Sequence, residues 1–322
     1  MTKFILAIIL SAGMNSIALA QSVTDSAYTE NSIMLQTATG NIYGTLTLPK
    51  TKNPVPVALI IAGSGPTDRN GNNPMMKNES LRLLAYGLAE NQIASLRFDK
   101  RGIAESKEAA KEEADVRFED FINDAKQWIT LLKKDKRFSK VFVIGHSEGS
   151  LIGMIAARNE ADGFISIAGA GKVANEILKE QLAKQPPVVK EASYPIIDSL
   201  VMGHQVKNVN PMLFALFRPS IQPYLISWFK YNPQNEIKQL SIPILILQGT
   251  NDLQVSTEDA QLLANANTKA KLVLIDNMNH VLKIVDGDTN VNIATYSNPA
   301  LPIATELIEQ IVIFIGTSST IK

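Results

Sequence analysis

The chain has 322 residues, of which 45% are hydrophobic and 19% are charged, the balance of an ordinary globular protein. Lys and Arg number 31 and Asp and Glu also number 31, so the net charge is zero and no basic surface for nucleic acid is indicated. The absence of cysteine excludes disulfides, thiolate metal sites and a cysteine nucleophile.

The first twenty residues have the pattern of a secretory signal peptide. Lys3 gives a positive start, Phe4 to Leu10 is a short apolar run, and Ala18 and Ala20 stand where a signal peptidase reads the chain. The apolar run is too short and too interrupted to be a convincing membrane span. We therefore expect residues 1–20 to be removed from an exported protein, periplasmic or secreted, that has no stable membrane insertion. An uncleaved anchor or a buried first helix is the alternative.

Apolar runs bounded by turn residues alternate with helix-period segments along the rest of the chain. Eight strands are expected, the first two as an antiparallel pair joined by a turn at Gly40-Asn41: Ser32–Thr39, Ile42–Leu48, Val57–Ala62, Ile93–Phe98, Val141–Ile144, Phe164–Ala168, Ile244–Leu247 and Leu272–Ile275. The expected helices are Leu81–Ala89, Val116–Leu132, Leu151–Ala157, Thr257–Ala266 and Ala304–Phe314. This order predicts an α/β fold with a mostly parallel eight-stranded sheet flanked by helices.

One interval breaks the alternation of strands and helices. About seventy residues without a strong strand signal separate Phe164 from Ile244, and a normal crossover needs far fewer. The segment is helix-prone and punctuated by prolines. We therefore expect a helical cap inserted at about residues 171–240. Most of its apolar clusters are expected to form the cap's own core and its seat on the sheet, and the rest to shape a pocket.

The segment Gly145-His146-Ser147-Glu148-Gly149 lies between an expected strand and an expected helix, the context of a nucleophile elbow. Reversing the chain in so few residues strains the middle residue, so the neighbours two before and two after it must lack bulk. Gly145 and Gly149 meet that need, and the turn aims the Ser147 hydroxyl at a cleft. The motif alone is only suggestive, and its strand-to-helix context makes the prediction specific.

A serine hydroxyl becomes a good nucleophile only when an oriented base takes its proton. Of the three histidines, His146 adjoins the serine and should point away from it, and His204 lies in the expected cap. His280 follows the last expected strand, and Asp252 follows the strand before it. The order serine, aspartate, histidine at the carboxyl ends of strands predicts a catalytic triad of Ser147, Asp252 and His280. The alternative for each residue is a polar surface position.

Two backbone N–H groups normally stabilise the oxyanion of acyl transfer. One is expected from Glu148 and the other from the segment Gly63–Pro66, with Ser64 as the first choice and Gly65 as the second. The alternative for this segment is a plain tight turn. It lacks the lysine and spacing of a phosphate loop, and no His, Asp and Glu cluster has metal-ligand spacing. No cofactor and no metal are therefore predicted.

From about Ser32 to the C-terminus the chain resembles the α/β-hydrolase superfamily, and within it the bacterial esterases and serine-aminopeptidase-like hydrolases. The resemblance is carried by Gly63–Gly71, Phe98–Gly102, the elbow, and the loops that contain the expected acid and base. It implies an α/β-hydrolase domain over residues 21–322 with the triad and oxyanion residues already named. The chain departs from the family where a serine replaces the common His-Gly pair at the start of the oxyanion loop.

These features predict a serine hydrolase that cleaves small-molecule carboxylic esters through an acyl-enzyme on Ser147. An aminopeptidase must bind a substrate ammonium, usually with carboxylates, but residues 171–240 contain eight Lys or Arg against five Asp or Glu. A serine aminopeptidase-like peptidase or amidase is the alternative. A non-catalytic binding protein on a hydrolase scaffold is disfavoured because all three triad residues are present. The sequence sets neither the acyl length nor the oligomeric state.

Overall fold

A computed structural model describes residues 27–320, and the predicted signal peptide lies outside the described residues. Eight strands form one sheet in the order β1-β2-β4-β3-β5-β6-β7-β8. The pairs β1–β2 and β2–β4 are antiparallel and the other neighbours are parallel, which confirms the predicted mostly parallel sheet. The strands are β1 Tyr28–Gln36, β2 Asn41–Pro49, β3 Val55–Ile61, β4 Ala94–Phe98, β5 Phe138–His146, β6 Gly163–Ile167, β7 Ile244–Gly249 and β8 Lys271–Ile275.

Strand β3 shows why the central strands read as continuous apolar runs. Val57 and Leu59 contribute to the hydrophobic core on one face of the sheet, whereas Ala58 and Ile60 contribute to the core on the other. Successive side chains of a strand point to opposite faces, so a strand that is covered on both sides needs an apolar residue at every position.

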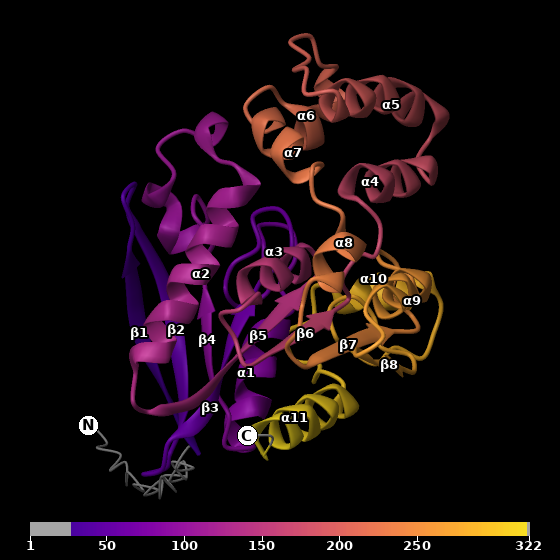
Figure 1. Cartoon of the computed structure of the whole chain (residues 1–322). Helices are drawn as coiled ribbons and strands as arrows, with labels where there is room; N and C mark the ends of the chain where they lie inside the picture. The colour runs from indigo at the N-terminus through magenta and orange to yellow at the C-terminus, as the bar shows by residue number, and fades with distance from the viewer. Residues whose placement is uncertain (1–26, 321–322) are drawn as a thin grey trace, which may run out of the picture.

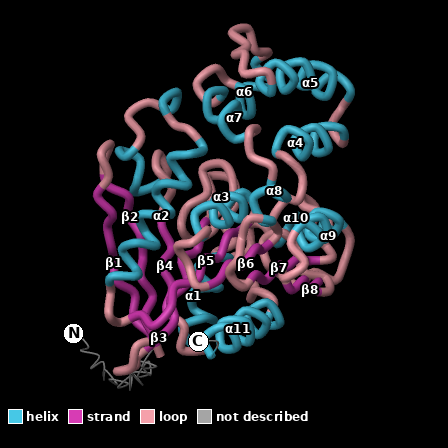
Figure 2. The backbone as a smooth tube through the Cα atoms, in the orientation of Figure 1, coloured by secondary structure: helices cyan, strands magenta, loops and turns pink. Residues whose placement is uncertain are grey.

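Helices cover both faces of the sheet, as Figures 1 and 2 show. One core joins the sheet to α2, α3 and α9, and the other joins it to α1 and α11. No helix among residues 27–320 is long and apolar enough to cross a membrane. These helices, with α10 and two short 3₁₀ segments, are α1 Ser80–Glu90, η1 Ala104–Ala109, η2 Glu113–Asp115, α2 Phe118–Lys134, α3 Glu148–Ala157, α9 Thr257–Ala266, α10 Thr289–Thr295 and α11 Thr305–Thr320.

Between β6 and β7, where the sequence predicts a cap, the chain forms five α-helices, and α4 to α7 lie at the upper right in Figure 1. Residues 171–240 are called the cap below. Prolines open several of its helices, because the missing N–H of proline costs nothing in the first turn. The segments are α4 Ala174–Ala183, α5 Pro187–Val201, η3 Pro211–Leu213, α6 Phe214–Phe217, α7 Gln222–Trp228 and α8 Pro233–Lys238.

The cap is seated on α2 through aromatic side chains. The ring of Phe118, at the start of α2, stacks on the ring of Trp228 in α7 at a centroid distance of 6.0 Å. The backbone N–H of Phe118 donates to the hydroxyl of Ser227 over 2.8 Å. Phe121 meets Tyr224 edge to face at 5.5 Å. These contacts hold one side of the cap against the domain beneath it.

Candidate active site

Ser147 stands between β5 and α3 in a backbone conformation that non-glycine residues rarely adopt, with φ 55° and ψ −121°. A Cβ atom on Gly145 would lie 2.2 Å from the carbonyl oxygen of Gly149, and one on Gly149 would lie 2.3 Å from that of Ile61. Neither position has room for a side chain, so the turn around Ser147 needs glycine at both. The backbone N–H of Ser147 donates to Ile167 over 2.9 Å and anchors the turn to β6.

The structure joins the predicted acid and base directly. His280 Nδ1 and Asp252 Oδ2 are 2.8 Å apart, and both side chains are buried. The other carboxylate oxygen of Asp252 accepts the backbone N–H groups of Gln254 and Val255, at 2.8 and 3.0 Å. Burial alone would raise the pKa of Asp252, but His280 and these N–H donors outweigh it, and the pKa is lowered. Asp252 is therefore ionised at neutral pH and holds the Nδ1 proton of the imidazole.

A buried amide network ties the loop of Asp252 to the loop of His280. Asn279 Nδ2 donates to Asn292 Oδ1 in α10 over 2.9 Å, and Asn292 Nδ2 donates to the carbonyl of Asn251 over 2.7 Å. Asn251 and Asn279 immediately precede the acid and the base in the chain. Helix α10 therefore links the loop of Asp252 to the loop of His280, a connection that the sequence did not reveal.

His146, the residue before Ser147, supports the backbone of His280. Its Nε2 donates to the carbonyl oxygen of His280 over 2.8 Å, and the two rings lie 4.8 Å apart. Burial, together with the nearby His280, lowers the pKa of His146 to about 3, so this ring is neutral near pH 7. Among the described residues no hydrogen bond joins Ser147 to His280. Such bonds are often long in free enzymes and tighten when substrate binds.

The predicted oxyanion segment passes beside Ser147. A Cβ atom on Gly63 would lie 3.1 Å from Cβ of Ser147, and Ser64 and Gly65 follow in an exposed part of the same loop. Lys100 Nζ donates to the carbonyl oxygen of Gly63 over 2.6 Å. The same ammonium pairs with Glu148 Oε1 at 3.0 Å, with both side chains almost fully buried. Lys100 therefore connects the loop to the residue after the nucleophile.

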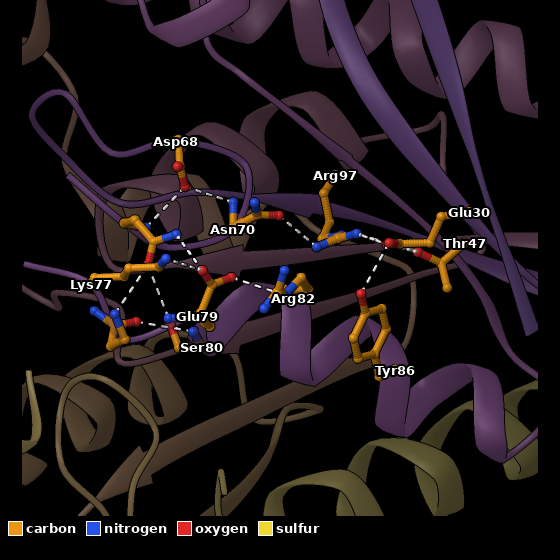
Figure 3. Close-up of polar contacts among 12 residues, drawn as sticks. Glu30, Thr47, Asp68, Asn70, Lys77, Glu79, Ser80, Arg82, Tyr86 and Arg97 are labelled. Carbon is orange, nitrogen blue, oxygen red and sulfur yellow. Dashed lines mark hydrogen bonds and ion pairs between the residues drawn. The ribbon is translucent and has the colours of Figure 1, made fainter. Parts of the chain in front are cut away.

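The far part of this loop is anchored to the sheet, as Figure 3 shows. Arg97, buried in β4, donates from Nη1 to Asn70 Oδ1 over 2.7 Å and pairs with Glu30 in β1. Glu30 also accepts a hydrogen bond from the hydroxyl of Tyr86 over 3.0 Å. Asp68 accepts the backbone N–H of Asn70 over 2.8 Å, which closes the local turn. These hydrogen bonds and ion pairs thus fix the far end of the loop that carries Ser64 against the sheet.

Lys100→Met is expected to lower the free energy of unfolding by about 3–5 kcal/mol, because it leaves the Glu148 carboxylate buried without a cation. Adding Glu148→Gln should recover most of this loss, because both charges are then gone. Urea denaturation measures both effects. Lys77→Met, at a side chain that is 70% exposed, is the control and should change stability by less than about 0.5 kcal/mol. A double variant as unstable as Lys100→Met would contradict the argument.

A cavity of about 870 Å³ extends from the elbow to the underside of the cap. Ser147, Glu148, Ser64 and Gly65 all line it, so the structure brings the predicted nucleophile and oxyanion residues to one space. Its other walls come from the loop after β4, from the chain between η1 and α2, and from α4, α6 and α7. The volume lies within the range of small-molecule sites in proteins.

A family model described as "Serine aminopeptidase, S33" matches residues 78–216. The chain is also similar to Esterase EstD from Thermotoga maritima, at 28% identity over 243 residues that make up 74% of this chain. The match covers 57% of EstD, so this chain spans little more than half the length of that relative.

Solved structures of other proteins share the fold. Est1E from Butyrivibrio proteoclasticus has a TM-score of 0.58 at 16% identity, covering 89% of this chain and 99% of Est1E. The alpha/beta hydrolase GrgF from Penicillium sp. sh18 has a TM-score of 0.61 at 17% identity, covering 90% of this chain and 99% of GrgF. At such identities the likeness establishes the architecture alone.

Proposed function

We propose that this chain, a member of the α/β-hydrolase superfamily, is a serine hydrolase that cleaves carboxylic esters through an acyl-enzyme on Ser147. The observation that carries the proposal is the hydrogen bond between His280 and an ionised Asp252. His280 also contacts His146, the residue directly before a strained serine that lines a cavity. A buried carboxylate that fixes the tautomer of an imidazole next to a serine is the arrangement that nucleophilic acyl transfer requires.

In the proposed reaction, Ser147 Oγ attacks the carbonyl carbon of the ester while His280 Nε2 takes the hydroxyl proton. The backbone N–H groups of Glu148 and of Ser64 or Gly65 hold the oxyanion that forms. The carbon–oxygen bond of the ester then breaks, and His280 gives its proton to the departing alcohol. Water, deprotonated by the same imidazole, attacks the acyl-serine and releases the acid, which restores the free hydroxyl.

The comparisons support two candidate substrates for this reaction. The similarity to EstD supports esters, whereas the matching family model, described as a serine aminopeptidase, favours peptides or amides with a free amino terminus. We rank esters first, because the cap carries more cationic than anionic residues and an aminopeptidase needs carboxylates for the substrate ammonium.

A comparison of p-nitrophenyl acyl esters with aminoacyl p-nitroanilides tests the ranking. We expect kcat/KM to be at least about 100-fold higher for the esters, which corresponds to a difference of about 2.7 kcal/mol in activation free energy. A higher kcat/KM for the anilides would reverse the order. Labelling by a fluorophosphonate probe distinguishes an esterase or a peptidase from a non-catalytic binding protein, in which Ser147 would stay unlabelled.

We further propose that the protein is exported to the periplasm or the medium after removal of residues 1–20. The support is the sequence alone, with small residues at positions 18 and 20 before Gln21. The intact mass of the protein made from the full chain in a bacterium should correspond to residues 21–322. A variant with arginine at both Ala18 and Ala20 should keep the full-length mass. An uncut wild-type chain would contradict this proposal.

A further inference from the structure

We propose that the acyl group accepted at Ser147 is large and apolar and carries no positive charge. The inference rests on the proposed ester hydrolysis and adds the class of acyl group. It follows from the size of the cavity under the cap, the chemistry of its walls, and the pairing of its charged side chains.

Most side chains that the cap contributes to the walls are apolar, and Lys172, Gln181 and Arg218 are the exceptions. At about 870 Å³ the cavity is in the upper part of the range for small-molecule sites, more than a short acyl group needs. Leu151 of α3 lines it near the nucleophile. The cap adds aliphatic and aromatic side chains from α4 and from the region of α7, namely Ile177, Leu178, Ile221, Leu225 and Trp228. An apolar acyl chain placed there moves out of water and onto an apolar surface. The free energy of this transfer is favourable in proportion to the apolar area that is buried.

The charged side chains of the cavity offer no free partner to a cation. Among the described residues that line it, five are cationic and only two, Glu113 and Glu148, are anionic. Glu148 is paired with Lys100 at 3.0 Å. Glu113 is paired with Arg218, whose Nε donates to it over 2.8 Å. Arg101 and Lys172 are likewise paired, with Asp124 and Glu180 outside the cavity. An ammonium on the acyl group would therefore be desolvated without a free carboxylate to receive it.

The length of the acyl chain should therefore control the rate. In a series of p-nitrophenyl esters from acetate to octanoate, kcat/KM should rise about fourfold for each methylene that enters the cavity, and so up to about 4,000-fold over the series. The 8-aminooctanoyl ester tests the charge. Its kcat/KM should be at least about 100-fold below that of the nonanoyl ester, which has a methyl group in place of the ammonium.

Filling the cavity should lower the preference for long chains. Leu178→Trp and Ile221→Trp, made separately, should each lower the octanoate-to-acetate ratio of kcat/KM by at least about tenfold. Val201→Trp is the matched control, because this side chain is in the cap, is 51% exposed and does not line the cavity. Its ratio should equal that of the wild type. Reaction with a fluorophosphonate shows that each variant has kept a folded site.

The outcomes separate this inference from the proposed function. Turnover of all esters with no dependence on acyl length would overturn the inference and leave ester hydrolysis standing. Equal rates for the ammonium ester and its neutral partner would do the same, and so would an unchanged octanoate-to-acetate ratio in both cavity variants. Failure to hydrolyse any ester, including acetate, would overturn the proposed function and this inference with it.

Discussion

Ser147→Ala is expected to lower kcat for p-nitrophenyl esters by about 10⁵-fold or more, because the variant has no hydroxyl to form the acyl-enzyme. His280 and Asp252 act by activating that hydroxyl, so their contribution is lost with it. The backbone should be unaffected, because alanine keeps the Cβ atom that Ser147 already places at φ 55°. Steady-state kinetics and urea denaturation measure the two effects separately.

Ser150→Ala is the matched control for this loss. Ser150 lies three residues further on in α3, is buried, and exchanges a hydrogen bond of 2.7 Å with the hydroxyl of Ser166. Removing its hydroxyl should cost about 1 kcal/mol of stability and change kcat by no more than a few-fold. A Ser147→Ala variant that keeps more than a hundredth of the wild-type kcat would show that another group is the nucleophile.

Asp252→Asn is expected to lower kcat by about 10⁴-fold while leaving the protein folded. An amide cannot hold the proton on His280 Nδ1 as the ionised carboxylate does, so the imidazole takes the other tautomer and turns a protonated Nε2 toward the serine. The amide oxygen can still accept the backbone N–H groups of Gln254 and Val255, and the loop should keep its shape. The kcat for p-nitrophenyl octanoate, with the urea midpoint beside it, measures this prediction.

Asp276→Asn controls for the loss of a negative charge near the site. Asp276 directly follows β8 and is exposed, and no side-chain hydrogen bond is assigned to it among the described residues. Its kcat should stay within about twofold of the wild type, because exposed substitutions rarely disturb a buried network. If Asp252→Asn behaves in the same way, Asp252 is not the acid of a triad.

Several elements could be predicted closely because their signals are local. Helix α9 has the predicted bounds, Thr257–Ala266, and its start is set by a capping box in which the Ser256 hydroxyl and the Asp259 carboxylate each accept the other's backbone N–H. Strand β7 begins at the predicted Ile244, where a run of buried aliphatic residues follows Pro243. The elbow likewise follows from two glycines and a serine within five residues.

Other elements depend on distant partners and were missed or misplaced. Strand β1 starts at Tyr28, four residues before the predicted start at Ser32. The added residues are mostly polar, and they belong to the strand because they pair with β2, from Tyr28 opposite Pro49 onward. Helix α10 was not predicted; it has only seven residues, and its signal is the carboxylate of Asp288, which caps its first N–H groups. The position of β4 between β2 and β3 follows from tertiary packing and leaves no trace in local periodicity.

The site shows the same division. The sequence predicted which residues would meet at the carboxyl ends of the strands, and the structure joins Asp252 to His280 and places Ser147 in a strained turn. The sequence did not predict the role of Lys100, whose hydrogen-bond partners Gly63 and Glu148 lie 37 and 48 residues away along the chain. One signal was available in the sequence. Lys100 follows Asp99 directly at the end of a buried strand, where a charged side chain needs a partner.

The cap leaves the sheet after β6 and returns to it before β7, so the loops that hold Ser147, Asp252 and His280 all lie outside residues 171–240. One uninterrupted stretch of the gene therefore encodes the whole cap. It encodes none of the three residues proposed to cleave the ester bond. Mutations can accumulate in that stretch, including insertions and deletions, without touching the hydrogen bonds around the imidazole. A chain arranged in this way can change its substrate range through mutations in the cap while it keeps the residues proposed to catalyse the reaction.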